Sequence, residues 1–163
     1  MSLLAPHPLW LSASFSPYEV SKATIQARML SGRYRTELLC SNWSANTNGF
    51  CLTPACHGLS LKEDLDHILA VCHSLEPTRK KLEIFTRNFA LQNPILGPIL
   101  GTYCTMSHPF FCQFLLDCTT IPAVISITTL YGSTLLYKLL YIGRTWCYSL
   151  HRERARLLDR WKL

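Results

Sequence analysis

Four residues in the first half of the chain combine the side-chain types and the spacing of a zinc site. They read C-x4-C-x10-H-x4-C and are Cys51, Cys56, His67 and Cys72. Zn²⁺ prefers thiolate and imidazole ligands, and a structural site closes with four of them. Two close pairs joined by a short loop can meet around one tetrahedral ion. The spacing therefore predicts a structural Zn²⁺ ion that staples a small module.

The same four residues also have an interpretation without metal. The cysteines can be small buried apolar groups, and His67 can be a core histidine. The chain has eight cysteines, so close spacings arise easily by chance, and His57 and His73 stand beside two of the candidates as substitute ligands. The ligand chemistry favours the metal, most directly for the three cysteines.

The cysteine usage indicates a reducing compartment. Residues 1–15 carry no positive n-region and are interrupted by Pro6 and Pro8, so a cleaved signal peptide is not expected. In a reducing compartment, clustered Cys and His are metal ligands more readily than disulfide partners. We therefore expect an intracellular protein, nuclear or cytoplasmic.

A loop and a helix are expected to present the four candidate ligands. The segment 39–61 is rich in Ser, Asn, Thr, Gly and Pro and has no usable period, so it is predicted to be a loop that carries the first two cysteines. The run 60–63 (SLKE) has the pattern of a capping box and predicts a helix that presents His67 and ends near Cys72.

Helical patterns account for most of the remaining chain. The run 16–19 (SPYE) caps a predicted helix over 17–31. Its predicted apolar stripe is Val20, Ala23, Ala27 and Leu30. Further helices are predicted over 78–89, 107–118 and 144–161, and the last of these has the pattern of a basic amphipathic helix. Two prolines and two glycines between 92 and 101 predict a break.

The predicted fold class is mostly α, with a small zinc-stapled loop-helix module followed by long amphipathic and apolar helices. The predicted organisation has a flexible N-terminus at 1–15, a helical zinc-knuckle module at 16–91, a linker at 92–106, and an apolar helix with a basic amphipathic helix at 107–163. At 163 residues, with 48% apolar side chains, the chain has enough apolar material for a core.

An uncharged stretch in the second half admits a membrane alternative. No charge lies between Asp117 and Lys138, a length nominally sufficient to span a bilayer. Several Ser and Thr residues dilute its apolar content, whereas the Arg-rich end would suit a cytoplasmic anchor. The alternative is a small membrane protein with one spanning helix near 118–137 and a basic cytoplasmic end. Membrane contact at 118–143, or a partner chain on the apolar helix, also remains open.

Positive charge is unevenly distributed along the chain, which has a formal net charge of +6. This asymmetry favours a polyanionic partner, RNA or DNA held through backbone phosphates, over an acidic small molecule. The candidate nucleic-acid-binding residues are Lys22, Arg28, Arg33, Arg35, Arg152, Arg156 and Arg160. Solvated helix faces with no partner are the alternative explanation of such charge runs.

Several short motifs, taken in order, resemble one family. They are 28–37 (RMLSGRYRTE), the Cys51 and Cys56 pair, 64–69 (DLDHIL) with Cys72, and 144–154 (RTWCYSLHRER) near the end. Together they resemble the zinc-binding region that follows the reverse transcriptase domain in non-LTR retrotransposon polyproteins. The resemblance implies a zinc knuckle, with the quartet as its ligands, that helps the polymerase to hold template RNA or target DNA.

Catalytic motifs are not found in the sequence. It has no Asp-Asp pair in a strand context, no Gly-rich phosphate loop and no Gly-x-Ser-x-Gly elbow. The polymerase of the family is missing, so the chain resembles a remnant or truncated frame. We expect no enzymatic activity.

Overall fold

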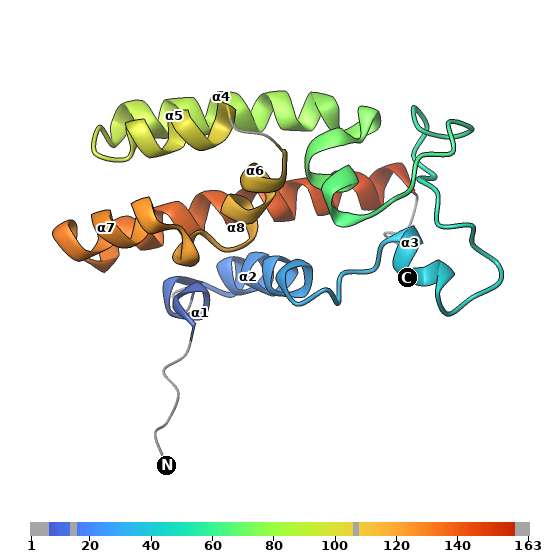
Figure 1. Cartoon of the computed structure of the whole chain (residues 1–163), viewed down its shortest axis with the longest axis horizontal. Coiled ribbons are helices and arrows are strands. Elements are labelled where there is room, and N and C mark those ends of the chain that lie inside the picture. The colour runs from blue at the N-terminus through green and yellow to red at the C-terminus, as the bar shows by residue number, and fades with distance from the viewer. Residues whose placement is uncertain (1–6, 14–15, 106–107, 159–163) are drawn as a thin grey trace, which may run out of the picture.

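Helix α8 (Ser133–Leu157) is the longest helix of the described chain, and most other helices pack against it. In this computed structural model, which describes residues 7–13, 16–105 and 108–158, α8 runs between α4 on one side and α1 with α2 on the other (Figure 1). The bounds of the shorter α-helices are α1 Pro8–Ala13, α2 Pro17–Leu30, α3 Glu37–Ser41, α4 Glu76–Gln92, α5 Gly97–Thr105, α6 His108–Leu116 and α7 Pro122–Tyr131. The mostly α fold class is confirmed, and the described ranges contain no strand.

One apolar face of α8 forms the centre of the core. Leu139, Ile142, Trp146 and Leu150 recur at helical spacing and are at most 1% exposed. The Trp146 ring packs edge-on against Phe111 of α6, and its Nε1 donates a hydrogen bond to Thr86 Oγ1 of α4 at 2.9 Å. Trp146 therefore ties α4 and α6 to α8 by burial and by a satisfied polar group.

A close approach of three helices surrounds Gly143. A Cβ atom at this position would lie 2.8 Å from Gln26 Nε2 of α2 and still closer to the carbonyl oxygen of Leu115 in α6. The Gln26 amide itself donates to the Leu115 and Leu116 carbonyl oxygens at 2.7 and 3.0 Å. These bonds satisfy the C-terminal carbonyl groups of α6, which a helix end leaves without partners. The absent side chain of Gly143 lets α2 and α6 pack on α8.

The predicted helix over 17–31 is present as α2, but its buried face differs from the predicted stripe. Ala23 is fully buried, whereas Val20 and Leu30 are 40% and 42% exposed. Lys22 and Gln26 are buried instead. Lys22 pairs with Glu19 of its own helix, and Gln26 donates a hydrogen bond to the Leu115 carbonyl of α6. Apolar periodicity alone could not anticipate partners that tertiary packing supplies.

Two segments expected to lack structure form short helices. Part of the predicted flexible N-terminus is α1, whose Leu9 is 2% exposed and whose turns pack on α2 and α8. The predicted linker at 92–106 contains α5, which packs on α4. Pro98 lies in the first turn of α5, where the fixed φ of proline and its missing N–H are tolerated. Buried Leu96 and Leu100 then anchor this helix.

The uncharged stretch at 118–137 is divided between two helices. α7 ends at Tyr131, and α8 begins at Ser133. Gly132 between them has a φ of +86°, a left-handed conformation that glycine adopts without steric cost. Among the described helices, none combines the length and the hydropathy that a bilayer crossing needs. The predicted helix at 144–161 is the second half of α8 as far as the structure describes it.

Candidate metal centre

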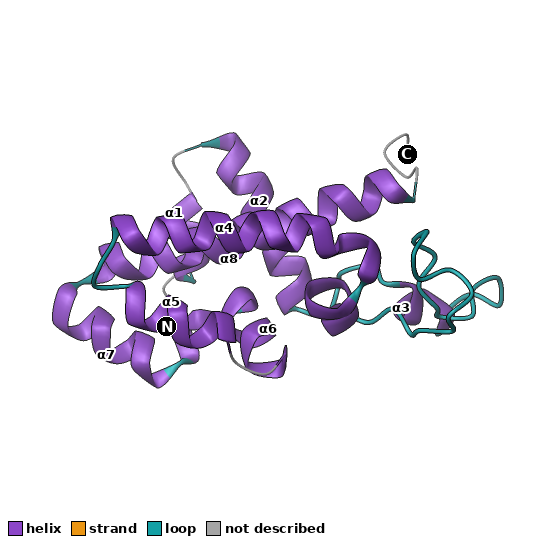
Figure 2. Ribbon diagram, turned by 90° about the horizontal axis from the view of Figure 1, so that it is seen from above, coloured by secondary structure: helices purple, strands orange, loops and turns teal. Residues whose placement is uncertain are grey.

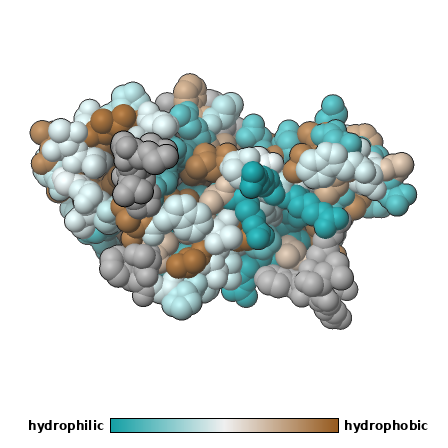
Figure 3. Space-filling model, turned by 90° about the horizontal axis from the view of Figure 1, so that it is seen from below, coloured by the Kyte–Doolittle hydropathy of each residue, from teal (hydrophilic) through white to brown (hydrophobic). Residues whose placement is uncertain are grey.

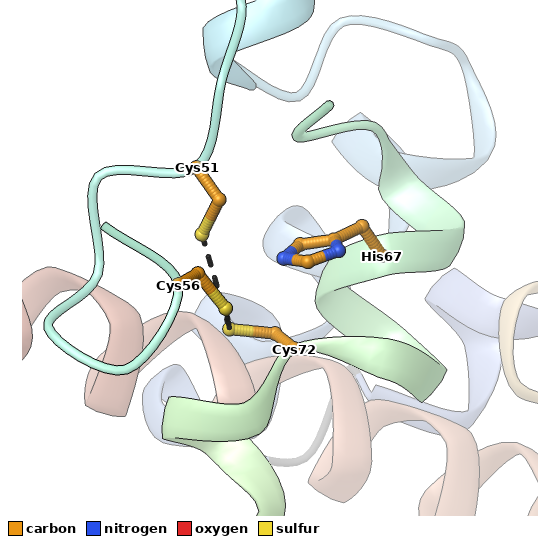
Figure 4. Close-up of side chains that lie close together, drawn as sticks. All are labelled: Cys51, Cys56, His67 and Cys72. Carbon is orange, nitrogen blue, oxygen red and sulfur yellow. Dashed lines mark hydrogen bonds between the residues drawn. The ribbon is translucent and has the colours of Figure 1, made fainter. Parts of the chain in front are cut away.

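Three sulfur atoms and one imidazole ring converge at the loop-rich end of the molecule (Figures 2 and 4). The Cys72 Sγ lies 3.9 Å from Cys51 Sγ and 3.7 Å from Cys56 Sγ. With His67 included, the four ligand atoms lie within 4.8 Å of one another, and all four residues are buried. Around Zn²⁺ with bonds of about 2.3 Å, two sulfurs of a tetrahedron are about 3.8 Å apart. The group can hold a metal ion.

Backbone hydrogen bonds place the first two cysteines. Phe50 and Lys62 form an isolated antiparallel bridge, and the Cys51 N–H donates to the Leu61 carbonyl at 2.8 Å. The chain then turns, and the Cys56 N–H donates to the Thr53 carbonyl at 3.0 Å. As a result both thiols point toward Cys72 (Figure 4). The predicted loop at 39–61 is therefore a loop held by hydrogen bonds around the two cysteines, but residues 39–41 belong to helix α3.

A π-helical turn, His67–Val71, places the other two ligands on one side. In an α-helix, residues five apart are turned by about 140° from each other, since each residue turns by about 100°. Here the Cys72 N–H donates to the His67 carbonyl at 2.6 Å, the i to i+5 bond of a π-turn. The wider turn brings both side chains to the same site. The sequence predicted a helix at this place but not its widened turn.

The predicted capping box at 60–63 is not formed. Ser60 has a φ of 52° and Lys62 belongs to the bridge. Helical turns begin only after Asp64, whose Oδ1 accepts a hydrogen bond from the His67 N–H at 2.7 Å. Glu63 instead forms a buried ion pair with Arg154 of α8. Asp64 therefore caps these turns, whereas the sequence pattern predicted Ser60 as the cap.

His67 supplies the observation that most directly points to a metal. Its ring extends toward the three sulfur atoms (Figure 4), and its Nε2 is buried without a hydrogen-bond partner. A buried polar atom without a partner costs about 1–3 kcal/mol. A neutral imidazole nitrogen is a common metal ligand, so a bound ion would satisfy this atom. The nitrogen lies within 4.8 Å of the three sulfur atoms, a position that suits a metal ligand.

The electrostatics of the cluster favour a thiolate at Cys72. The hydrogen bond from the Cys51 thiol lowers the pKa of Cys72 far below its usual range, and the same interaction raises the pKa of Cys51. Thr53 Oγ1 adds contacts of 3.1 Å to Cys51 Sγ and 3.3 Å to Cys72 Sγ. Thiolates are the ligands of metals, and hydrogen bonds stabilise them. Thr53 thus stabilises two of the candidate ligands through hydrogen bonds. Its position between Cys51 and Cys56 in the sequence could have indicated this role.

Arg79 of α4 lies behind the cluster and was not anticipated from the sequence. It is 9% exposed, and its Nη2 donates to the Cys72 carbonyl at 2.6 Å. Burial lowers the pKa of Arg79, and the charges of Cys72, Glu76 and Glu83 partly offset this effect. Three thiolates, one neutral imidazole and a divalent ion carry a net charge of −1, so a buried guanidinium compensates the loaded site. No local pattern joins Arg79 to the quartet.

The candidate nucleic-acid-binding residues do not all reach the surface. Lys22 is 6% exposed, and its Nζ pairs with Glu19 at 2.7 Å and lies over the Tyr18 ring. It is therefore removed from the set of phosphate-binding candidates. Arg160 lies outside the described residues. The exposed members are Arg28, Arg33, Arg35, Arg152 and Arg156.

The two basic segments lie together although more than a hundred positions separate them in sequence. Tyr34, between Arg33 and Arg35, contacts His151 of α8 through an Oη to Nδ1 distance of 3.0 Å. Arg152 follows His151 directly. Figure 3 shows hydrophilic side chains gathered over the half of this face that carries the end of α2 and the segment leading to α3. The fold thus brings the segment that carries Arg33 and Arg35 next to the part of α8 that carries Arg152.

Comparison with known proteins gives no relative. No protein-family model, curated protein or solved structure matches the chain. The geometry alone therefore defines the site: a buried Cys₃His group able to hold a metal ion, on a mostly helical fold.

Proposed function

We propose that this chain is a zinc-stapled nucleic-acid-binding module, similar to the region that follows the reverse transcriptase domain in non-LTR retrotransposon polyproteins. The proposal includes no polymerase activity of its own. It rests first on the buried Cys₃His group, with the unpartnered Nε2 of His67 as the single observation that carries it. The order of the motifs along the sequence supports the family assignment.

Zinc is the metal that suits this set of ligands. Three thiolates and one imidazole in a closed tetrahedral arrangement are typical of structural Zn²⁺ sites. Four protein ligands leave no position for water, so the ion would stabilise the fold and would not act on a substrate. The burial of all four residues supports a structural role.

Nucleic acid is the polyanion that the basic surface would hold. Guanidinium groups pair with phosphates in a bidentate manner, and the exposed cations of this surface are arginines. Arg28, Arg33 and Arg35 lie at the end of α2 and after it, and the contact of Tyr34 with His151 joins this segment to the part of α8 that carries Arg152 and Arg156. Binding through phosphates has little sequence preference and weakens steeply with salt.

Metal content tests the first half of the proposal. We expect about one zinc per chain in the native protein, measured by atomic emission, because the site closes with one ion. Cys56→Ser should lose most of this zinc, whereas the control Cys40→Ser should keep it because Cys40 lies outside the quartet. Equal zinc in native protein and Cys56→Ser would refute the assigned site.

Salt-dependent binding tests the second half. A labelled RNA titrated between 50 and 200 mM NaCl should lose affinity linearly on logarithmic axes, with a slope of about −0.7 for each phosphate contact. Replacing Arg152 and Arg156 by Gln should reduce that slope. Lys80→Gln should reduce it less, because Lys80 is on α4, and α4 and α2 lie on opposite sides of α8 (Figure 1). No retained RNA or DNA at low salt would end the proposal.

A further inference from the structure

A polar pocket lies beside the metal centre, between α3 and the loop that leads to Cys51. It encloses about 580 Å³, within the range of sites that hold small molecules. Its polar lining includes Arg35, Glu37, Ser44, Asn46, Thr47 and Asn48. Leu52 also lines the pocket and is the sequence neighbour of Cys51, so the pocket adjoins the candidate metal site. Amide and hydroxyl groups of this kind can donate and accept hydrogen bonds in one plane.

The loop that forms the pocket is held in one shape. Thr47 Oγ1 donates to Glu37 Oε2 at 3.1 Å, and Asn48 Oδ1 accepts from the Phe50 N–H at 3.1 Å. Gly49 has a φ of +77° and lies against α3, where a Cβ would come within 3.3 Å of Leu38. The pocket therefore exists before a ligand arrives, which lowers the ordering cost of binding.

The charge at the pocket favours an anion at its rim. Arg35 is exposed, and its Nε donates to Cys40 Sγ at 3.3 Å, which orients the guanidinium along the pocket. The one acidic lining residue, Glu37, lies 3.8 Å from the buried cation of Arg154. Glu63 shares the same Arg154, so the charge of Glu37 is offset only in part, and Arg35 at the rim is the group that would hold a phosphate.

An exposed tryptophan stands next to the pocket. Trp43 directly precedes the lining residue Ser44 and is 78% exposed. Its backbone N–H donates a hydrogen bond to the Cys40 carbonyl at 3.0 Å. The backbone at Trp43 is thus anchored at the end of α3 while the indole remains in solvent. Exposed aromatic rings next to basic residues provide stacking surfaces for the bases of single strands.

We infer that this pocket takes one unpaired base of a single-stranded nucleic acid, with Arg35 on the adjoining phosphate and Trp43 stacked on a neighbouring base. The inference rests on the proposed nucleic-acid function and adds to it a preference for single strands. A duplex keeps its bases stacked inside and can offer only phosphates to the arginines. A base in the pocket could form hydrogen bonds with the Asn46 and Asn48 amides, which a phosphate polymer without bases cannot reproduce.

Fluorescence anisotropy of the full chain tests this inference with three ligands of similar charge. They are a labelled twelve-nucleotide oligouridine, a hairpin duplex, and heparin as a competitor without bases. Stacking on one aromatic ring contributes enough that Trp43→Ala should weaken single-strand binding by about tenfold. Duplex binding should not change, and Trp43→Tyr should recover most of the single-strand affinity. Trp10→Ala removes another exposed tryptophan, on α1, and should leave both affinities unchanged.

The outcomes separate this inference from the proposed function. If the native chain binds both forms in a salt-dependent manner but Trp43→Ala changes neither, the base site is refuted and the phosphate-binding surface stands. If heparin displaces the oligouridine as well as unlabelled oligouridine does, charge alone explains binding and the base site is again refuted. If the native chain binds no nucleic acid, both proposals fail together. Equal melting temperatures of native protein and Trp43→Ala would confirm that the variant is folded.

Discussion

The ion pair between Arg154 and Glu63 joins the end of α8 to the segment that carries the metal ligands. Glu63 is 0% exposed and Arg154 is 6% exposed. The Glu63 carboxylate accepts hydrogen bonds from Nε of Arg154 at 3.2 Å, from its Nη2, and from the Glu37 N–H at 2.9 Å. Changing Arg154 to Met would leave a fully buried carboxylate without its cation.

The size of this effect follows from the burial of both partners. Breaking a buried pair by removing one partner costs about 3–5 kcal/mol. A domain has about 5–15 kcal/mol of stability in total, so the Arg154→Met variant should lose a large part of it. For a chain of this length, each kcal/mol corresponds to about 2–4 °C, and the melting temperature should fall by about 6–20 °C.

Urea and thermal unfolding followed by circular dichroism measure this loss. The double variant Arg154→Met with Glu63→Gln should be more stable than Arg154→Met, because the Gln is neutral and still accepts from the Glu37 N–H. Arg156→Met is the control, since the Arg156 side chain is 64% exposed and its pair with Glu153 is solvated. A loss below about 1 kcal/mol in Arg154→Met, as for an exposed pair, would refute the reasoning.

Three further perturbations have defined outcomes. Gly143→Ala should lower stability by about 1–3 kcal/mol in urea unfolding, since its Cβ would meet α6, while Gly101→Ala, in open space on α5, should not. Burial and the charges of Arg154 and Arg28 lower the pKa of His151, so folding favours its neutral form. The melting temperature should therefore fall as pH drops below about 6.5, and less so in His151→Gln; an identical pH profile would contradict this. Chelation should lower the melting temperature, and one added equivalent of zinc should restore it; no shift would contradict the metal site.

Local sequence signals predicted the helices well where their ends depend on nearby residues. The helix from Pro17 was anticipated from its serine, proline and glutamate, which are adjacent in sequence, although the Ser16 side chain makes no capping hydrogen bond in the fold. The pattern at 60–63 was misleading because Glu63 pairs with Arg154, 91 positions away. A capping signal describes only what the nearest turn can offer, and a distant cation was the stronger partner here.

The positions of the charged residues also depend partly on local sequence and partly on contacts between distant segments. The sequence placed Lys22 among the surface cations because a charge normally remains solvated. In the fold, Glu19 and the rings of Tyr18 and Tyr141 surround its amino group, so it can be buried. Conversely, Arg33 and Arg152 were separate candidates in the sequence, and only the packing of α2 on α8 brings their segments together.

The sequence by itself determined the candidate ligand set, because the affinity of thiolate and imidazole for metal ions belongs to the side chains and short spacings limit where they can lie. It also determined the helical class, through periodicity and local caps. The tertiary structure decided how the ligands converge, through the π-turn that aligns His67 with Cys72 and the buried Arg79 behind them. These features depend on contacts between segments distant in the chain and on backbone geometry that no local pattern encodes.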